Sequence, residues 1–443
     1  LEALARERGD RALELAALIP QATIHSTYTA EFDPAQGRAL SERALALARA
    51  LKDYRAEAKA LWNLMLLTLF ARYDARQAVA YGEDALALAR RHNLREELAY
   101  ILHDIARAYF EAGQAGPAWI AQEEALALWR ELGDLPMLAD ALTSSANRHY
   151  WVGEYDKAMA LAQEALRISQ SIGNAWGQAY SLSMIGSLHL ERGEVEAGIQ
   201  AMEQAIALAE QANYWGSQVF DRAILAWVYG LLGDLPRAFE IAHLALAKTE
   251  EFSQPHQPVL AVLALLHLYN GNRDEAAAAL DQVGQAKLGG AQDAYPESAL
   301  LFDLIDGEVA LARHEYERVL HVADRVIAAM RANKMRPVLP NMLYLRSRAL
   351  LGLGRIVEAG RALAEARTEL EALGTPHSLL LLPVVYALDE IEARAGDHAE
   401  VRALRQKARD VADHLSAHIH APDLRARFLA LPAVQTVMRQ PNA

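Results

Sequence analysis

The chain contains no cysteine, which excludes disulfide bridges, thiolate nucleophiles and thiolate-bound zinc. Aromatic residues make up only 7% of the 443 residues, and only seven residues are lysine. The longest apolar runs, 61–70, 259–269 and 378–388, fall short of the roughly 18 residues that a bilayer-spanning helix needs. No signal peptide is visible either. We therefore expect a soluble, cytoplasmic protein without a membrane anchor.

Acidic residues outnumber basic ones, 57 against 44, which gives a net charge of −13. This sign opposes the phosphate contacts that dominate nucleic-acid binding, so we expect no direct nucleic-acid binding by this region. The sequence also lacks a phosphate loop ending in Gly-Lys-Ser/Thr, a Gly-x-Ser-x-Gly elbow and a His-Glu-x-x-His motif. We predict no catalytic residue and no cofactor, and we expect that the chain is not an enzyme.

A repeat of 40 or 41 residues runs through much of the chain. The segment Ala-Leu-Ala-Leu-Ala-Arg begins at Ala44 and again at Ala85, and related pairs begin at 125, 165, 205 and 245. Between these markers, apolar residues recur at helical spacing. A residue suited to a left-handed C-cap follows the predicted helices; these residues are Asn93, Gly113, Gly133, Gly153, Gly173, Gly193, Asn213, Gly233, Gly271 and Gly354. Each repeat is therefore predicted to be two helices and two turns.

Small residues mark the places where the two helices of each hairpin cross. On the second helix the marker positions, which predict ten hairpins, are Gly37, Ala78, Ala118, Ala158, Gly198, Ala238, Ala276, Val319, Ala359 and Val401. On the first helix they are Ala106, Ala146, Gly186, Ala226 and Ala264. Three residues after each of these comes an aromatic or histidine slot, filled by Tyr109, His149, His189, Tyr229 and His267. Recurrence at one repeat position predicts a structural role for these side chains.

This pattern of small residues and aromatic slots resembles the tetratricopeptide repeat (TPR) family. The period of 40 residues, against about 34 in most of that family, is similar to the MalT-like variant in the sensor arm of bacterial STAND signal-transduction ATPases. The resemblance implies an all-α, right-handed α-solenoid superhelix of about ten TPR-like helical hairpins. It also implies a non-catalytic sensor domain of a multidomain bacterial signalling or transcriptional regulator.

One irregular segment interrupts the repeat. We expect a regular TPR-like array over 1–283, an irregular loop over 284–296, diverged TPR-like repeats over 297–415, and a C-terminal capping helix and tail over 416–443. The segment 284–296 holds three glycines and a proline without periodicity, which is typical of a surface loop; a hinge between two arrays is the alternative. The opening residues Ala3 to Arg6 match the second-helix phase, so we expect the array to continue a longer protein.

The first helix of each hairpin lines the concave side of such a stack. Its outward positions mix aromatic, amide and hydroxyl side chains, as binding surfaces do. The predicted ligand-binding or partner-binding residues are Asn63, Tyr100, His103, Arg107, Phe110, Asp140, Thr143, Asn147, Tyr150, Trp151, Tyr180, Ser183, Ser187, Phe220 and Trp227. We predict that Asn63 and Asn147 hydrogen-bond to the backbone of an extended peptide and that Arg107 binds a carboxylate.

Two further interpretations concern these aromatic side chains and a group of histidines. Longer helices could pack on neighbouring repeats and bury Tyr150, Phe220 and Trp227 as core. Near the C-terminus, His414 and His418 have the spacing of two metal ligands on a helix, but no carboxylate or cysteine completes a set with them and His420, so no metal site is predicted.

The expected partners are a protein or peptide, or a small-molecule effector, together with upstream ATPase and output domains of the same polypeptide; no membrane is expected. The alternative functions are a freestanding TPR adaptor or scaffold, a peptide receptor, and an enzyme with an unrecognised site in the concave groove.

Overall fold

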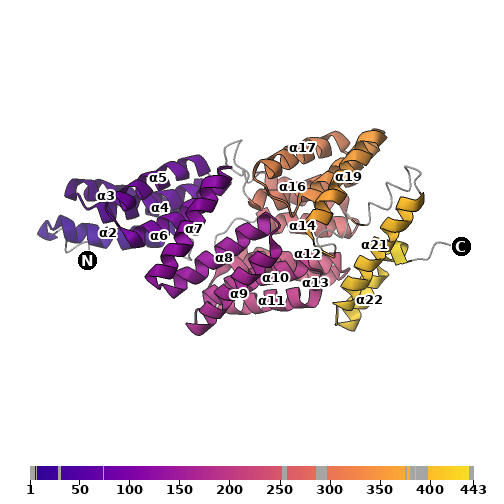
Figure 1. Cartoon of the computed structure of the whole chain (residues 1–443), viewed down its shortest axis with the longest axis horizontal. Helices are drawn as coiled ribbons and strands as arrows, with labels where there is room; N and C mark the ends of the chain where they lie inside the picture. The colour runs from indigo at the N-terminus through magenta and orange to yellow at the C-terminus, as the bar shows by residue number, and fades with distance from the viewer. Residues whose placement is uncertain are drawn as a thin grey trace. The chain divides into compact units, whose positions relative to one another are not determined.

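The computed structural model describes residues 5, 7–27, 31–72, 74–251, 257–285, 297–374, 377–379, 385 and 398–438. Within these residues every regular element is a helix, and successive helices pair as hairpins (Figure 1). The predicted all-α solenoid is therefore confirmed. Among the described helices, none combines the length and the apolarity that a bilayer crossing requires.

Even-numbered helices up to α18 are the first helices of their hairpins, and odd-numbered helices are the second. The elements up to the middle of the array are α2 (Arg11–Ser26), α3 (Pro34–Leu51), α4 (Tyr54–Arg72), α5 (Ala75–Arg91), α6 (Arg95–Glu111), α7 (Ala115–Leu132), α8 (Leu135–Trp151), α9 (Tyr155–Ser171), α10 (Ala175–Glu191) and α11 (Val195–Gln211). A π-helical segment, η1 (Ser217–Asp221), leads directly into α12 (Arg222–Leu231). The remaining helices are α13 (Leu235–Glu251), α14 (Gln257–Tyr269), α15 (Arg273–Gln285), α16 (Glu297–Ala312), α17 (Tyr316–Ala332), α18 (Leu339–Gly352), α19 (Ile356–Leu373), α21 (His398–Ala417), α22 (Pro422–Ala430) and α23 (Pro432–Met438).

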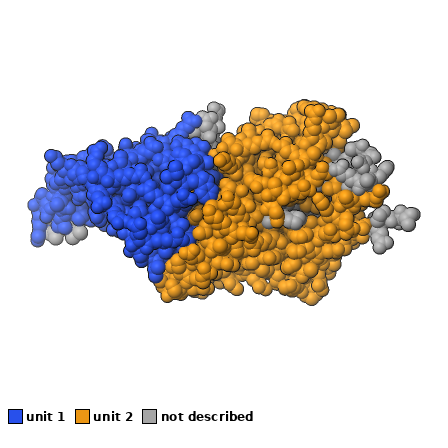
Figure 2. All heavy atoms as spheres, viewed as in Figure 1, with its two compact units in different colours: residues 1–142, 288–296 blue, residues 143–287, 297–443 orange. Residues whose placement is uncertain are grey.

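The chain divides into two compact units (Figure 2). Unit 1 comprises residues 1–142 and 288–296, and unit 2 comprises residues 143–287 and 297–443. The division falls within α8, whereas the sequence places its one interruption at 284–296. Residues 286–296 of that loop lie outside the described residues, so its role as a loop or hinge stays a prediction. The short helices α22 and α23 occupy the segment for which a terminal capping helix is predicted.

The turns follow the predicted capping chemistry. Every predicted cap residue has a left-handed backbone, with φ between 49° at Asn213 and 83° at Gly271. At the other ends of the helices, the side chains of Asp33 and Asn174 accept hydrogen bonds from first-turn amides, as N-caps do. Local sequence therefore sets where most of the described helices end and where several of them begin.

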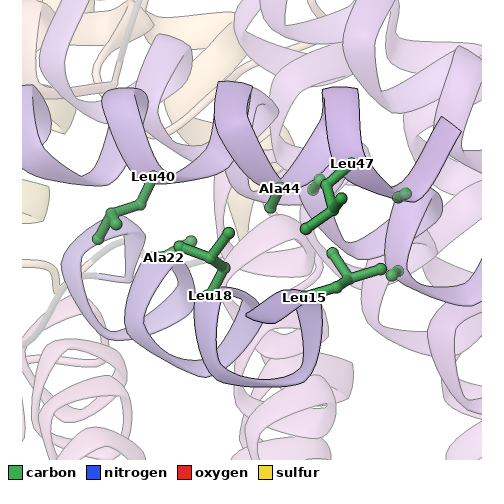
Figure 3. Close-up of a cluster of buried hydrophobic side chains, with 9 residues drawn as sticks. Leu15, Leu18, Ala22, Leu40, Ala44 and Leu47 are labelled. Carbon is green, nitrogen blue, oxygen red and sulfur yellow. The ribbon is translucent and has the colours of Figure 1, made fainter. Parts of the chain in front are cut away.

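Small residues let paired helices approach closely. A Cβ added to Gly186 of α10 would lie 2.8 Å from Met202 Cγ and 3.2 Å from the Gly198 carbonyl oxygen. In the α2–α3 hairpin, leucine and alanine side chains of the two helices face one another (Figure 3); the labelled side chains are Leu15, Leu18 and Ala22 of α2 and Leu40, Ala44 and Leu47 of α3. The aromatic slot is structural, since Tyr229 is buried and Tyr109 donates from its hydroxyl to Glu83 Oε1 at 3.2 Å.

Unit 2 also closes on itself through contacts between segments far apart in the chain. We call the glycines Gly153, Gly193 and Gly233, which follow α8, α10 and α12, the turn edge. Three main-chain hydrogen bonds join these turns to C-terminal segments. Arg336 N, between α17 and α18, donates to Trp151 O at 2.9 Å, and Leu379 N, after α19, donates to Leu190 O at 3.3 Å. Glu196 N, in the first turn of α11, donates to His418 O, after α21, at 3.1 Å. The C-terminal repeats of unit 2 therefore pack on the turn edge of its own central repeats.

Candidate ligand-binding surface

The predicted strip lies on the first helices and consists of rows spaced by one repeat. Residues 40 positions apart occupy equivalent places on neighbouring first helices, as with Arg107, Asn147, Ser187 and Trp227. Side chains between the rows join consecutive first helices, and Trp62 Nε1, for example, donates to Asp104 Oδ2 at 2.7 Å. Some rows of side chains therefore face the neighbouring first helix, and other rows remain accessible to solvent.

Four predicted residues belong to rows that face a neighbouring helix. Asn63, His103, Phe110 and Thr143 are all buried, and Asn63 has 0% of its surface exposed. Its Nδ2 donates to Thr23 Oγ1 at 3.2 Å inside unit 1. The expectation that these four side chains line an exposed surface is wrong, because a first helix contacts two neighbouring first helices as well as its own partner.

The other predicted residues of unit 1 are engaged within it. Arg107 Nε donates to Glu111 Oε1 at 2.8 Å, and its guanidinium lies 5.2 Å from the centre of the Phe70 ring. Glu111, one turn away on the same helix, thus supplies a carboxylate of the kind that Arg107 is predicted to bind. Tyr100 is half-buried between two tryptophan rings, and Asp140 is half-buried beside a buried histidine.

Unit 2 carries a more open surface on α8, α10, η1 and α12. We call it the unit 2 stripe; it consists of Ser144, Asn147, Tyr180, Ser183, Ser187, Phe220, Ile224 and Trp227. All eight side chains are at least partly exposed, and Phe220 is 40% exposed. None of them carries a charge, and three are aromatic. The stripe therefore combines rigid apolar area with hydroxyl and amide groups.

Sequence reasoning missed Ser144 and Ile224. The sequence prediction placed Thr143 on the accessible face of α8, whereas Thr143 is buried and the next residue, Ser144, is partly exposed. A spacing of four and then three residues, as in Phe220, Ile224 and Trp227, keeps side chains on one helical face. Applying that spacing throughout would have found both positions.

Tyr150 and Trp151 lie at the turn edge of unit 2. The Tyr150 hydroxyl donates to Glu191 Oε1 at 2.7 Å, and its ring meets the Trp151 ring edge-on with the centroids 5.4 Å apart. The Trp151 carbonyl oxygen accepts the bridging bond from Arg336. Both side chains are half-buried. The alternative of complete burial does not hold for Tyr150, for the half-buried Trp227 or for the exposed Phe220.

A buried carboxyl group lies behind the stripe. Asp221 is 3% exposed and accepts a hydrogen bond from Ser183 Oγ, which also lies 2.9 Å from Ser217 Oγ. Burial raises the pKa of Asp221 to about 7, although the two serine hydroxyls and the charge of Arg222 act to lower it. The π-helical segment η1 ends at this residue, and such segments are frequent at functional sites.

The raised pKa of Asp221 predicts a pH-dependent stability. The folded chain retains the proton more strongly than the unfolded chain, so this stabilisation is complete below pH 4 and is lost as the pH rises to about 7. We expect Asp221→Asn to be closest to the wild type at pH 4 and to exceed its free energy of unfolding by about 1–3 kcal/mol at pH 8. Urea unfolding at both pH values measures this difference, and the exposed Asp274→Asn is the control. A difference that does not change with pH would contradict the assignment.

Comparisons with known proteins agree with this architecture. Residues 138–172 match the tetratricopeptide repeat family. A Rap protein solved in complex with the competence and sporulation factor is 14% identical with a TM-score of 0.59, over 82% of this chain and 98% of that chain. Aspartyl phosphate phosphatase F from Bacillus subtilis is also 14% identical, with a TM-score of 0.47 over 74% of this chain and 75% of its own. No curated protein matches the chain. The family match and the first of these structures show a TPR-type helical repeat fold.

Proposed function

We propose that the unit 2 stripe binds an extended peptide segment of a partner protein. The absence of charge among its eight partly exposed side chains carries this proposal. A surface that faces only water is rich in Glu, Lys and Arg, whereas the stripe offers aromatic rings beside hydroxyl and amide groups. Protein-binding surfaces accumulate these groups, because rigid rings supply contact area and polar groups supply directed hydrogen bonds.

The chemistry of the stripe indicates the kind of peptide. The Asn147 amide can both donate to and accept from a peptide backbone. The Ser183 and Ser187 hydroxyls donate within unit 2, to Asp221 Oδ2 and to the Ser183 carbonyl oxygen, and offer a peptide an acceptor oxygen. The rings of Tyr180 and Trp227 suit apolar side chains of the ligand. The net charge of −13 disfavours acidic ligands. We therefore infer a neutral or basic peptide with apolar side chains.

The fold of a known complex supports a ligand-binding role. The Rap protein with a similar fold was solved with the competence and sporulation factor bound. At 14% identity this likeness concerns the fold alone, so no binding residue is transferred from it. The stripe itself supplies the residues of the proposal.

The finer proposal is that the chain is a non-catalytic sensor domain of a bacterial STAND-type regulator in the cytoplasm. The 40-residue period and its MalT-like pattern support it, and a peptide or small-molecule effector would then act on ATPase and output domains upstream. The second candidate is a freestanding adaptor or peptide receptor. A nucleotide-binding ATPase domain encoded upstream in the same reading frame would favour the sensor, and a complete hairpin directly after a start codon would favour the adaptor.

Peptide selection tests the binding proposal. We expect random 12-residue peptides displayed on mRNA to be enriched on the immobilised chain, and Tyr180→Ala/Trp227→Ala to weaken the dissociation constants of the enriched peptides at least roughly tenfold. Ser187→Arg should do the same without removing a packed ring. The control is Leu244→Ala, since Leu244 is 53% exposed on α13, outside the stripe. Fluorescence polarisation gives the constants, and circular dichroism checks folding. A failure to enrich peptides, or an equal loss in the control, would refute the proposal.

A further inference from the structure

We infer that the segment 377–379 and helix α21 form a latch on the turn edge of unit 2, and that this latch opens when the stacked rings of His377 and His414 take up protons. Its regulatory consequence rests on the proposed function, because the surface it would regulate is the unit 2 stripe. The existence of the latch rests only on contacts within unit 2.

The latch fits closely against the turn between α10 and α11. A Cβ added to Gly193 would lie 2.4 Å from the His377 carbonyl oxygen and 3.0 Å from His414 Cδ2. Buried Leu379 donates its N–H to the Leu190 carbonyl oxygen on one side of this turn. Close backbone contact of this kind exists only while the C-terminal segments are docked.

Three imidazole rings stack at this contact. The ring centroids of His377 and His414 are 4.1 Å apart with 14° between the planes, and those of His414 and His418 are 4.2 Å apart with 33° between the planes. His414 Nε2 lies 3.1 Å from the Arg192 carbonyl oxygen, to which it can only donate. These contacts suit neutral rings, because imidazolium charges about 4 Å apart repel one another.

The stacking also argues against a metal ion at this position. Nearly parallel rings direct their nitrogen lone pairs alongside one another, whereas metal ligands must converge on one point. His420, which the sequence groups with His414 and His418, is exposed. Within the described part of the chain, no group of three His, Asp or Glu side chains is placed to hold a metal ion.

The surroundings of the stack favour neutral rings. Burial lowers the pKa of His377 and of His414, and the neighbouring histidines lower both further. Asp410 on α21 opposes this effect at His377, and Glu194 at the turn opposes it at His414. These two carboxylates already accept hydrogen bonds, from Gln406 and His189 respectively. Three further titratable side chains belong to residues that contact the latch or its turn. Arg192 donates to Asp156, and Glu191 accepts from Tyr150 and Ser378. Glu196 donates its main-chain N–H to the His418 carbonyl oxygen.

The direction of the pH effect follows from these positions. Well above pH 6.5, the ordinary histidine pKa, the rings of His377 and His414 are neutral in both the closed and the open state, and the latch stays closed. Below that pH the open state binds protons more readily than the closed state, so acidification favours opening. Each ring contributes at most roughly tenfold to the opening equilibrium between pH 7.5 and 5.5, and His377 and His414 together up to about a hundredfold.

The latch is coupled to the helices that carry the stripe. Ser378 Oγ donates to Glu191 Oε2 at 2.8 Å, and the same carboxylate accepts the Tyr150 hydroxyl at the end of α8. Asn147 of the stripe lies three residues before Tyr150 on that helix. Opening therefore releases the ends of α8 and α10, whose spacing determines the width of the stripe.

A thiol reporter tests the latch in the full chain, which has no cysteine of its own. Ser378 is 1% exposed, so Ser378→Cys should react with 5,5′-dithiobis(2-nitrobenzoic acid) only when the latch opens. The exposed Ser171→Cys corrects for the pH dependence of the thiolate itself. We expect the rate ratio of the two variants to rise about 10- to 100-fold from pH 7.5 to pH 5.5. Leu379→Cys provides a second reporter if Ser378→Cys itself loosens the contact.

Histidine variants identify the origin of this rise. His377→Gln/His414→Gln should abolish it, whereas His420→Gln on the same C-terminal segment should leave it unchanged. A pH-independent ratio in both reporters, or an equal rise in the double variant, would overturn the latch. No peptide is used in this experiment, so a failed peptide selection would count against the stripe and not against the latch.

Discussion

Gly193→Ala is expected to lower the free energy of unfolding by about 2–5 kcal/mol, because it adds overpacking to a left-handed backbone strain. Its φ of 71° costs a non-glycine residue about 1–2 kcal/mol. The new methyl group would also meet the His377 carbonyl oxygen at 2.4 Å, which must move for the methyl group to fit. Urea unfolding followed by circular dichroism measures the change.

Gly173→Ala is the matched control for this prediction. Gly173 has a φ of 67°, and nothing lies within 4 Å of its added Cβ. Gly173→Ala should therefore lower the free energy of unfolding only by the cost of the left-handed backbone, about 1–2 kcal/mol. Equal costs for the two variants would show that the C-terminal segments do not pack on the turn edge in solution.

Glu191→Ala is expected to lower the free energy of unfolding by about 3–5 kcal/mol, because it removes the buried carboxylate that accepts two hydroxyl hydrogen bonds and opens a cavity. Glu191 is 2% exposed and accepts from Tyr150 and from Ser378. Burial raises the pKa of this carboxyl group, although both hydrogen bonds act to lower it. Unfolding at pH 7 measures the change.

Glu191→Gln separates the hydrogen bonds from the charge. The amide retains the shape of the carboxyl group, accepts from one hydroxyl and donates to the other. Because burial penalises a charge at this position, we expect Glu191→Gln to cost less than about 1 kcal/mol. Similar losses in Glu191→Ala and Glu191→Gln would contradict the role of the two hydroxyl contacts.

The sequence predicts the hairpins well, because their determinants are local. A left-handed cap needs Gly or Asn at one position, and a close helix crossing needs a small residue such as Gly186 or Ala226. Both signals recur with the period and are confirmed by the backbone angles and by burial. The fold class therefore follows from residues within each repeat and its neighbours.

The exposed rows are harder to predict, because each first helix has several neighbours. When one hairpin is considered alone, Asn63 and Thr143 lie on the face that points away from the partner helix. Both are nevertheless buried, and both contact an adjacent first helix. An error of one residue on a helix turns a side chain by about 100°. That rotation separates buried Thr143 from partly exposed Ser144.

No local sequence pattern predicts that the C-terminal repeats of unit 2 pack on the turn edge of its central repeats. Gly193 and Gly271 are equivalent cap residues after first helices in the sequence, but of these two only Gly193 meets a C-terminal segment. The bond between Ser378 and Glu191 joins residues 187 positions apart, and neither residue type is unusual on a helical repeat. Such contacts depend on the curvature of the whole unit, which the repeat pattern does not encode.

Photo-crosslinking tests peptide binding at the unit 2 stripe most directly. Benzoylphenylalanine is placed at Ser187 on the stripe or at Leu244 outside it, and each full-length variant is irradiated with a peptide enriched from the 12-residue library. We expect a covalent adduct at Ser187 that excess unlabelled peptide suppresses, and no such adduct at Leu244. An adduct at Leu244 that the same peptide suppresses, with none at Ser187, would place the binding surface elsewhere and contradict the proposal.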